Sequence, residues 1–378
     1  MMGPAATELG IELRVLTESA DSCAVAAVAH HQVGDYRDWE TLLTFAQGVD
    51  VVTFDHEHVP TEHLKALGDA GVRVHPQPSA LVHAQDKIVM RKAVEALGLP
   101  NPRWAQVSTP EELIAFAAHH WPVVLKTPRG GYDGKGVLLV HSAQEVREGL
   151  AAQWLADHTF PALLAEEAVP FTRELSALVA RSPSGDVRSW PVVESIQVNG
   201  VCDEVLAPAP DLDPQVAQAA AAAARTLATE LGVTGVMAVE LFEVPGGHFL
   251  INELAMRPHN SGHWTMNGSI TGQFEQHLRA VLDLPLGDPQ PMCEATVMKN
   301  ILGGSCDDLF QGFAAAMTTV PAAKIHLYGK SVRPGRKVGH VNVTGESLHE
   351  ITTLRTQAQR AADMIRSGER SSVMSPAS

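Results

Sequence analysis

The chain has 378 residues, of which 45% are hydrophobic and 19% charged, and its formal net charge is −15. A chain of this length is expected to form two or three domains, and its acidic balance argues against a nucleic-acid partner. No apolar run approaches the roughly 18 residues of a membrane-spanning helix and no secretory signal is evident, so we expect no membrane partner and a cytoplasmic protein. Four cysteines without a C-x-x-C pair argue against a zinc ribbon or a disulfide framework: Cys23, Cys202, Cys293 and Cys306.

The first 80 residues alternate apolar runs with amphipathic segments. The expected strands are residues 11–19, 49–55 and 72–76, and the expected helices are residues 38–48 and 60–71. This alternation predicts an open parallel sheet covered by helices. The sequence "DHEH" at 55–58 follows one of these strands. Because no third metal ligand is suggested nearby, a solvated loop is the preferred interpretation and a metal site the weaker one.

The middle of the chain is richer in strand signals. In chain order we expect a helix over 86–100, strands over 121–128 and 136–142, a helix over 143–158, and antiparallel strands over 162–169 and 173–196 with a turn at 183–186. A helix over 213–233 should follow, with Asp213 as its N-cap and Gly232 as its stop. Residues 235–244 and 248–258 then predict an antiparallel pair, and the C-terminal part predicts strands over 324–330 and 338–345 and a helix over 346–366.

A glycine-rich loop lies in "LKTPRGGYDGKGVLLV", residues 125–140. Backbone amides of such a loop can approach a polyphosphate closely, because no Cβ stands in the way. The loop is neither a Walker A motif nor a Rossmann fingerprint, because it joins two strands and opens no helix. We interpret it as a flap that closes over phosphates; the alternative is a plain glycine hairpin turn.

Charged residues on apolar segments support the phosphate interpretation. Lys126 lies inside the apolar strand before the loop, where a lysine is costly unless it meets an anion. Lys87 begins a helix, where its charge opposes the helix dipole, although a solvated surface lysine explains it equally well. Glu240 and Glu253 lie on two neighbouring apolar strands, and with Asn252 they could bind Mg²⁺ together with nucleotide phosphates.

These residues, in this order, resemble the ATP-grasp enzymes. Three stretches are similar, more narrowly, to the N5-carboxyaminoimidazole ribonucleotide synthase family: "GGYDGKG" at 130–136, "NELAMRPHNSGHWT" at 252–265 and "HLYGKSVRPGRKVGHVNV" at 326–343. The resemblance covers about residues 10–350. It implies an α/β and α+β fold class, with an ATP-grasp fold, an N-terminal open parallel α/β (pre-ATP-grasp) domain and a small C-terminal β-rich domain. The implied bounds are 1–80, 81–290 with a mobile lid at about 105–165, 291–367, and a disordered tail at 368–378.

The resemblance also implies an activity. Such enzymes are ATP-dependent carbon–nitrogen ligases of purine biosynthesis, which carboxylate 5-aminoimidazole ribonucleotide (AIR) with ATP and bicarbonate through carboxyphosphate. The expected cofactors are ATP and one or two Mg²⁺ ions, and the expected assembly is a homodimer. Bicarbonate is a poor electrophile, so phosphorylation supplies a leaving group, and the protein mainly positions the reactants and neutralises charge.

Individual roles follow by similarity to the family. The implied ATP-binding residues are Lys87, Lys126, Gly131, Tyr132, Asp133, Gly134, Lys135, Gly136, Val137, Glu166, Glu167, Ala168, Val169, Glu174, Gln197, Asn252 and Glu253. The implied metal ligands are Glu240 and Glu253, the implied catalytic residues Tyr132, Asp133, Arg257 and Lys330, and the implied AIR-binding residues Asn260, Lys330, Arg333, Arg336 and Lys337. The polar loop with His259, Ser261 and His263 is assigned to the substrate pocket, with polar loop packing as the alternative.

The sequence departs from the family pattern in two places. Gln197 stands where many members have a histidine near the nucleotide; glutamine can form hydrogen bonds but carries no charge. The chain begins at "MMGPAATELG", which resembles the middle of the family's first helix, so we expect a natural start roughly 10–20 residues earlier, the length of a strand and a glycine-rich turn.

Other functions are less consistent with these residues. Another ATP-grasp ligase, such as the formate-dependent glycinamide ribonucleotide transformylase, is the alternative within the superfamily. A non-catalytic nucleotide-binding protein would be expected to lack Lys126, Glu240 or Glu253, and all three are present. A Rossmann dehydrogenase is disfavoured because no G-x-G-x-x-G follows a strand.

Overall fold

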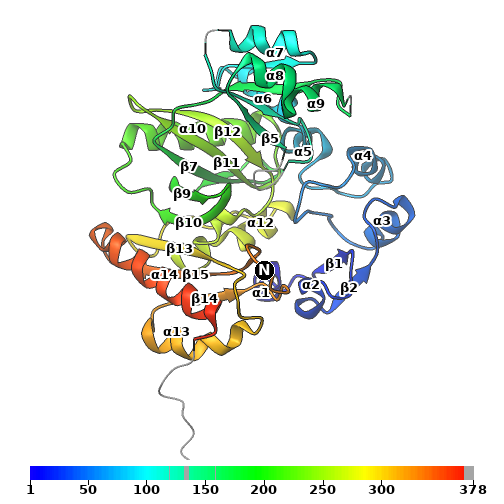
Figure 1. The fold of residues 1–378 in the computed structure, drawn as a ribbon. Helices are drawn as coiled ribbons and strands as arrows, with labels where there is room; N and C mark the ends of the chain where they lie inside the picture. Colours follow the sequence, from blue (N-terminus) through cyan, green and yellow to red (C-terminus); the bar gives the residue numbers. More distant parts are fainter. Residues whose placement is uncertain (119, 132–135, 158, 370–378) are drawn as a thin grey trace, which may run out of the picture.

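The computed structural model describes residues 1–118, 120–131, 136–157 and 159–369. Figure 1 shows the N-terminal part at the right, a small sheet with its helices at the top, and a large sheet that runs from the centre to the C-terminal helices. No helix of the described residues is long and apolar enough to cross a membrane.

The N-terminal part contains one short parallel sheet and a series of helices. Its elements are α1 (Met2–Glu8), β1 (Arg14–Thr17), α2 (Cys23–Ala27), β2 (His30–Val33), α3 (Trp39–Ala46), α4 (Thr61–Asp69) and α5 (Pro78–Gln85), and β1 pairs with β2. The strands expected over 49–55 and 72–76 are wrong as strands, because the two segments share only a parallel bridge between Val52 and Val74. Both valines and Phe54 are buried in the core, and this burial explains the apolar pattern without a longer ladder.

A four-stranded antiparallel sheet forms the top layer in Figure 1. Its strands are β3 (Trp104–Val107), β4 (Val123–Lys126), β5 (Val137–Val140) and β6 (Leu163–Glu167), in the order β3-β6-β4-β5. The helices of this region are α6 (Lys87–Ala96), which leads into it, α7 (Pro110–Ala117), α8 (Ala143–Glu148) and α9 (Leu150–Ala156). The single helix expected over 143–158 is wrong, because Gly149 is extended and separates α8 from α9.

Nine strands of the described chain form the large sheet. Its strands are β7 (Arg173–Arg181), β8 (Val187–Ser189), β9 (Val193–Val198), β10 (Val201–Ala207), β11 (Gly235–Val244), β12 (His248–Ala255), β13 (Ala295–Leu302), β14 (Lys324–Leu327) and β15 (Lys337–Gly345). Eight of them follow the order β12-β11-β7-β9-β10-β13-β15-β14, and β8 pairs with β7. Residues 173–196 form antiparallel strands around the turn predicted at 183–186, where β7 pairs with β8, whereas β6, from the predicted strand 162–169, lies in the four-stranded sheet.

Helices cover both faces of the large sheet. They are α10 (Pro214–Glu230), α11 (Thr265–Gly268), α12 (Gln273–Val281), α13 (Phe313–Thr319) and α14 (Ile351–Ser367). The side chain of Asp213 caps α10 as predicted by accepting a hydrogen bond from the Gln215 amide. Strand alternation buries Leu175, Ala177 and Val179 of β7 in the core with α10 and places Glu174 and Ser176 on the other face.

The large sheet crosses the expected boundary at residue 290. Strand β10 pairs with β13 through Glu204–Ala207 and Thr296–Lys299. The predicted bounds of the domains remain a prediction, but the C-terminal strands continue the sheet of the preceding region and do not form a separate one.

Candidate active site

A cavity of about 880 Å³ lies between the two sheets and is closed on one side by a loop of the N-terminal part. Its wall combines residues from β4, β6, β7, β11 and β12 with Glu57–Glu62. Most of the predicted site residues of the described chain line it: Lys87, Lys126, Gly131, Val137, Glu166, Glu167, Ala168, Val169, Glu174, Gln197, Glu240, Asn252, Glu253, Arg257, Asn260 and Lys337. The structure therefore brings together segments that are far apart in the sequence.

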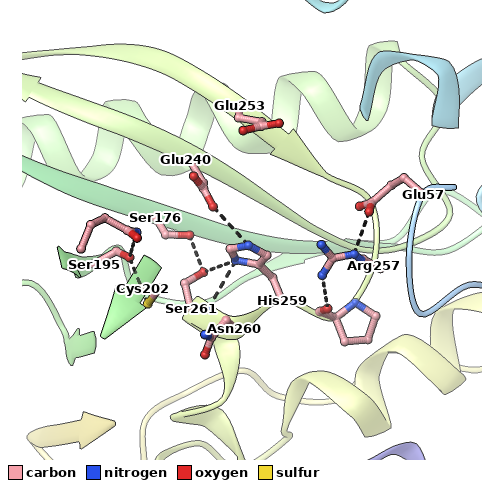
Figure 2. A network of polar contacts seen from close by, with 12 residues as sticks. Glu57, Ser176, Ser195, Cys202, Glu240, Glu253, Arg257, His259, Asn260 and Ser261 are labelled. Atoms are coloured by element: carbon pink, nitrogen blue, oxygen red, sulfur yellow. Dashed lines mark hydrogen bonds and ion pairs between the residues drawn. The ribbon is translucent and has the colours of Figure 1, made fainter. Parts of the chain in front are cut away.

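The two predicted metal ligands occupy opposite positions on neighbouring strands. Glu240 of β11 pairs in register with Glu253 of β12, so both side chains lie on the cavity side of the sheet. The Lys87 ammonium group lies 2.8 Å from Glu253 Oε1, and His259 Nε2 lies 3.1 Å from Glu240 Oε1. Figure 2 shows both carboxylates above the loop that carries His259.

This donor set fits Mg²⁺. The ion prefers oxygen ligands and uses few protein carboxylates, since substrate phosphates and water complete its octahedron. The described residues contain no group of three or more His, Cys, Asp or Glu side chains that could hold a metal by themselves. Two facing glutamates beside two lysines therefore fit a metal that arrives with a nucleotide better than a permanent structural metal.

Lys126 and Glu166 form a buried ion pair on the side of the cavity that the four-stranded sheet forms. The Lys126 ammonium group lies 2.7 Å from Glu166 Oε2, and its distance to Asn252 Oδ1 is 3.5 Å. Burial alone would raise the pKa of Glu166, but the charges of Lys126 and Arg91 outweigh this effect and hold its pKa below the ordinary value. Glu166 is therefore a carboxylate, and it accepts from two cations.

Glu174 has the opposite electrostatic environment. Burial is the main cause that raises its pKa to about 7, and the nearby charge of Glu240 adds to the effect. Gln197 also lines the cavity, and its amide donates a hydrogen bond of 3.1 Å to Ser195 Oγ. Both residues thus lie in the cavity that the sequence assigns to the nucleotide, and their contacts with a nucleotide remain predictions.

The "DHEH" loop is partly solvated, since Asp55 and His58 are exposed, but Glu57 and His58 also belong to the cavity wall. Glu57 turns inward and forms an ion pair of 2.9 Å with Arg257 Nε, so the predicted catalytic arginine is held by the N-terminal part. Figure 2 shows the Glu57 carboxylate directed at the Arg257 guanidinium group. No sequence pattern indicates this pair, because Glu57 and Arg257 are 200 positions apart.

The polar loop after β12 forms a hydrogen-bonded chain. His259 Nδ1 lies 2.8 Å from Ser261 Oγ, which lies 2.7 Å from Ser176 Oγ. Asn260 lines the cavity, whereas His263 is buried behind it, where its ring stacks on His340 and its pKa falls well below the ordinary value because of burial. His263 therefore fits the packing alternative, and His259 and Asn260 fit the pocket assignment.

The four basic residues that are predicted to bind AIR do not all line the cavity. Lys337 lines the cavity, while Lys330, Arg333 and Arg336 lie in the connection between β14 and β15, outside the lining of this cavity. The Arg336 guanidinium donates to Ser331 Oγ at 2.7 Å, and the Lys330 ammonium group lies 5.4 Å from the centre of the Tyr328 ring. Contact of these three residues with AIR remains a prediction.

Part of the flap lies outside the described residues, and this includes Tyr132, Asp133, Gly134 and Lys135. The ends of the flap are described: Gly131 and Val137 line the cavity, and the carbonyl of Gly136 accepts a hydrogen bond of 3.0 Å from the Thr127 amide. β4 and β5 pair in antiparallel register on either side of the loop, as the sequence predicts.

A cavity between two sheets, with lysines toward one sheet and paired glutamates on the other, defines the class of ATP-grasp enzymes. The sequence matches the family described as ATP-grasp domain over residues 92–274. It also matches the ribonucleotide synthetase preATP-grasp domain over residues 1–85 and the phosphoribosylaminoimidazole carboxylase C-terminal domain over residues 296–353. The expected fold class is confirmed by these three matches.

Individual relatives show to which family within the ATP-grasp enzymes this chain belongs. The N5-carboxyaminoimidazole ribonucleotide synthase of Corynebacterium ammoniagenes is 50% identical over 97% of this chain and 89% of its own length. The crystal structure of the synthetase from Thermus thermophilus has a TM-score of 0.86 and 36% identity, over 96% of this chain and 95% of that one. The Aspergillus clavatus enzyme, crystallised with ADP and AIR, has a TM-score of 0.84 and 30% identity, over 97% and 95% of the two chains. This chain belongs to the N5-carboxyaminoimidazole ribonucleotide synthase family.

Proposed function

We propose that this chain carboxylates the amine of AIR with ATP and bicarbonate and releases ADP and phosphate. The observation that carries the proposal is the register pair Glu240–Glu253 beside Lys87 and Lys126, in a cavity whose far wall supplies Arg257, Asn260 and Lys337. Anion-binding and cation-binding side chains thus face one space. The ADP and AIR bound by the Aspergillus clavatus relative support the assignment of both substrates.

The reaction proceeds in two steps. A bicarbonate oxygen attacks the γ-phosphorus of ATP, the bond to the β–γ bridging oxygen breaks, and ADP leaves with carboxyphosphate formed. The AIR amine nitrogen then attacks the carboxyphosphate carbon, the C–O bond to phosphate breaks, and the nitrogen loses a proton. Because each step is a displacement between highly charged groups, positioning and charge neutralisation are the main contributions of the protein.

In the part of the cavity that we assign to the nucleotide, lysines, backbone groups and an acidic residue position the nucleotide. Lys87 and Lys126 bind ATP phosphates, the backbone of 166–169 holds the adenine, and Glu174 accepts hydrogen bonds from the ribose hydroxyls. Each of these residues lines the cavity. Glu174 must be ionised to accept two such bonds, so its raised pKa makes nucleotide binding near neutral pH favour release of its proton.

Glu240 and Glu253 would hold one or two Mg²⁺ ions against the nucleotide phosphates. Bound there, Mg²⁺ would neutralise the charge that develops on the transferred phosphoryl group. Glu253 is paired with Lys87, and Glu240 with His259, so both carboxylates are already held in place by partners outside the metal site. Such partners fix the orientation of a metal ligand before the metal arrives.

The part of the cavity that we assign to AIR, the acceptor substrate, lies toward the N-terminal part and the C-terminal strands. Arg257 meets the transferring phosphoryl group, and its ion pair with Glu57 sets its direction. We propose that Tyr132 and Asp133 act on AIR and carboxyphosphate, that Lys337 and Asn260 bind AIR, and that Lys330, Arg333 and Arg336 bind its phosphate. We also propose that the chain acts as a homodimer in the cytoplasm.

The deciding experiment measures AIR-dependent ADP formation by the purified chain in the presence of Mg²⁺ and bicarbonate. We expect ADP and phosphate to appear in equal amounts with the carboxylated product, and only when AIR and bicarbonate are both present. The control reactions replace bicarbonate by formate and AIR by glycinamide ribonucleotide. Turnover in the formate reaction with glycinamide ribonucleotide, and none with AIR, would overturn the proposal in favour of the transformylase.

A further inference from the structure

Arg91 is a completely buried cation that does not line the active-site cavity. It lies on α6, its side chain has 0% exposure, and its guanidinium group forms four hydrogen bonds. Nε donates to Glu166 Oε1 at 2.5 Å, Nη1 to Asn101 Oδ1 at 3.0 Å and to the Ile251 carbonyl at 2.6 Å, and Nη2 to the Asn252 carbonyl at 2.8 Å. Burying a charge costs desolvation free energy, which these four hydrogen bonds offset.

The contacts of Arg91 close a polar ring of four residues, which we call the Arg91 ring. Glu166 joins Arg91 through Oε1 and Lys126 through Oε2. Lys126 approaches the Asn252 side chain at 3.5 Å, and the Asn252 carbonyl accepts from Arg91. The members come from α6, β6, β4 and β12, so the ring connects the four-stranded sheet to the large sheet on the two sides of the cavity.

The charges of the Arg91 ring do not cancel. Two cations share one carboxylate, so the ring carries a net charge of +1. Arg91 cannot reach the cavity, whereas Lys126 lines it and its side chain is 12% exposed. The unmatched positive charge is therefore available only at Lys126, where it faces the space proposed for the nucleotide phosphates.

Removing Arg91 would change this electrostatic balance. Glu166 has a 4% exposed side chain and would keep Lys126 as its single cationic partner. Lys126 would then have to leave a buried carboxylate without compensation in order to meet a phosphate, and an unpaired buried charge is strongly unfavourable. Arg91 thus stabilises Glu166 so that Lys126 can contact an anion.

We propose that Arg91 is a positioning residue of the nucleotide site, which acts through Glu166 to keep Lys126 available for a phosphate. The inference rests on the ATP-binding part of the proposed function. It does not depend on the identity of the acceptor substrate, because the Arg91 ring contains no residue of the AIR side.

The test is nucleotide binding by calorimetry with Mg²⁺ and a non-hydrolysable ATP analogue, which reports affinity for the folded fraction alone. Arg91→Met should weaken binding at least tenfold. The double variant Arg91→Met/Glu166→Gln should recover most of this loss, because the carboxylate that captures Lys126 is gone. Arg91→Lys, which keeps a cation beside Glu166, should bind within about threefold of the wild type.

The matched control is Arg355→Met. Arg355 pairs with buried Glu204 at 2.7 Å, on α14 and away from the active-site cavity, and its loss should leave nucleotide affinity unchanged. The inference is overturned if a folded Arg91→Met variant binds the analogue like the wild type, or if the double variant binds no better than the single one. A wild-type chain that fails to bind the analogue would instead count against the proposed function.

Discussion

Glu240 and Glu253 are directly opposed across the β11–β12 hairpin, and the register of the pair shifts immediately after Glu240. Such an irregularity re-aims the side chains that follow it. Two carboxylates in opposed positions repel each other unless cations lie between or beside them. Here Lys87 and His259 hold one carboxylate each, and a divalent cation carried by a nucleotide would compensate both.

Glu253→Gln is expected to keep the fold and lose most ATP turnover. The change removes one proposed anionic Mg²⁺ ligand, and metal stabilisation of a transferred phosphoryl group amounts to several kcal/mol, so kcat should fall by about two orders of magnitude. Steady-state ADP release at saturating Mg²⁺ measures the effect. Glu275→Gln, which breaks a partly buried pair with Arg279 away from the cavity lining, is the control and should retain turnover. Wild-type turnover in Glu253→Gln would contradict the metal assignment.

Glu174→Gln is expected to stabilise the nucleotide-free protein at pH 8 and to have little effect at pH 5. The Glu174 pKa is about 7 in the folded protein and about 4.5 without the fold, so unfolding releases a proton between these values. Wild-type stability should therefore fall as the pH rises from 4.5 to 7. Thermal unfolding of both proteins across this range gives the difference. Glu230→Gln, at an exposed position of α10, should show no such trend, and parallel curves for Glu174→Gln and wild type would refute the prediction.

Arg336→Ala is expected to raise the KM for AIR about tenfold and to leave the KM for ATP unchanged. The physical basis is the loss of a charge-assisted hydrogen bond to the AIR phosphate, worth about 1.5–3 kcal/mol. Steady-state kinetics with each substrate varied in turn separates the two constants. Arg360→Ala, at an exposed position of α14, is the control. If both KM values rise together, Arg336 serves only to shape its turn through Ser331.

Acidification to pH 5 is expected to destabilise the protein through His277. This residue is buried, accepts from the Val236 amide through Nδ1 and contacts Thr53 Oγ1 at 2.7 Å, and burial lowers its pKa to about 3. The stability that neutral His277 contributes is complete above its ordinary pKa of 6.5 and is lost as the pH falls toward 3. At pH 5 the loss is about 2 kcal/mol.

His277→Gln can keep both hydrogen bonds without a titrating group, so it should reduce the loss of stability between pH 7 and pH 5. Denaturant unfolding at the two pH values measures the change. His349→Gln alters an exposed histidine and should retain the wild-type pH dependence. An unchanged pH dependence in His277→Gln would assign the acid sensitivity to other groups, such as the neighbouring His75.

Elements with a strong local signal were predictable from the sequence. The β11–β12 hairpin and its two glutamates, the capped helix α10 and the strands around the glycine-rich loop lie where the patterns indicate. Each of these elements is determined by the hydrophobic periodicity, the capping residues and the turn residues of one short segment. Among the proposed ligands, costly charges on apolar strands mark only Lys126, Glu240 and Glu253, whereas 166–169, Glu174 and Gln197 follow from the resemblance to the family.

Features that depend on tertiary contacts were not predictable. Arg91 stands beside Lys92 in a helix whose composition gives no reason to bury one of the two, and its partners lie up to 161 positions away. Glu57 is an ordinary loop residue until Arg257 approaches it. The sheet to which each strand belongs was not predictable for the same reason. β6 and β7 are neighbours in sequence, and only tertiary packing places them in different sheets.

The pairing of β10 with β13 has a consequence for the modularity of this enzyme. Cutting the chain near residue 290 would expose both strands of that pair and leave a row of N–H and C=O groups without partners on each piece. Free edges of this kind pair readily with other chains. The C-terminal region can therefore not be transplanted as an independent acceptor-binding unit, and a fragment that starts near residue 291 is expected to self-associate through the edge of β13. Any exchange of acceptor specificity within the family has to occur side chain by side chain on an intact sheet.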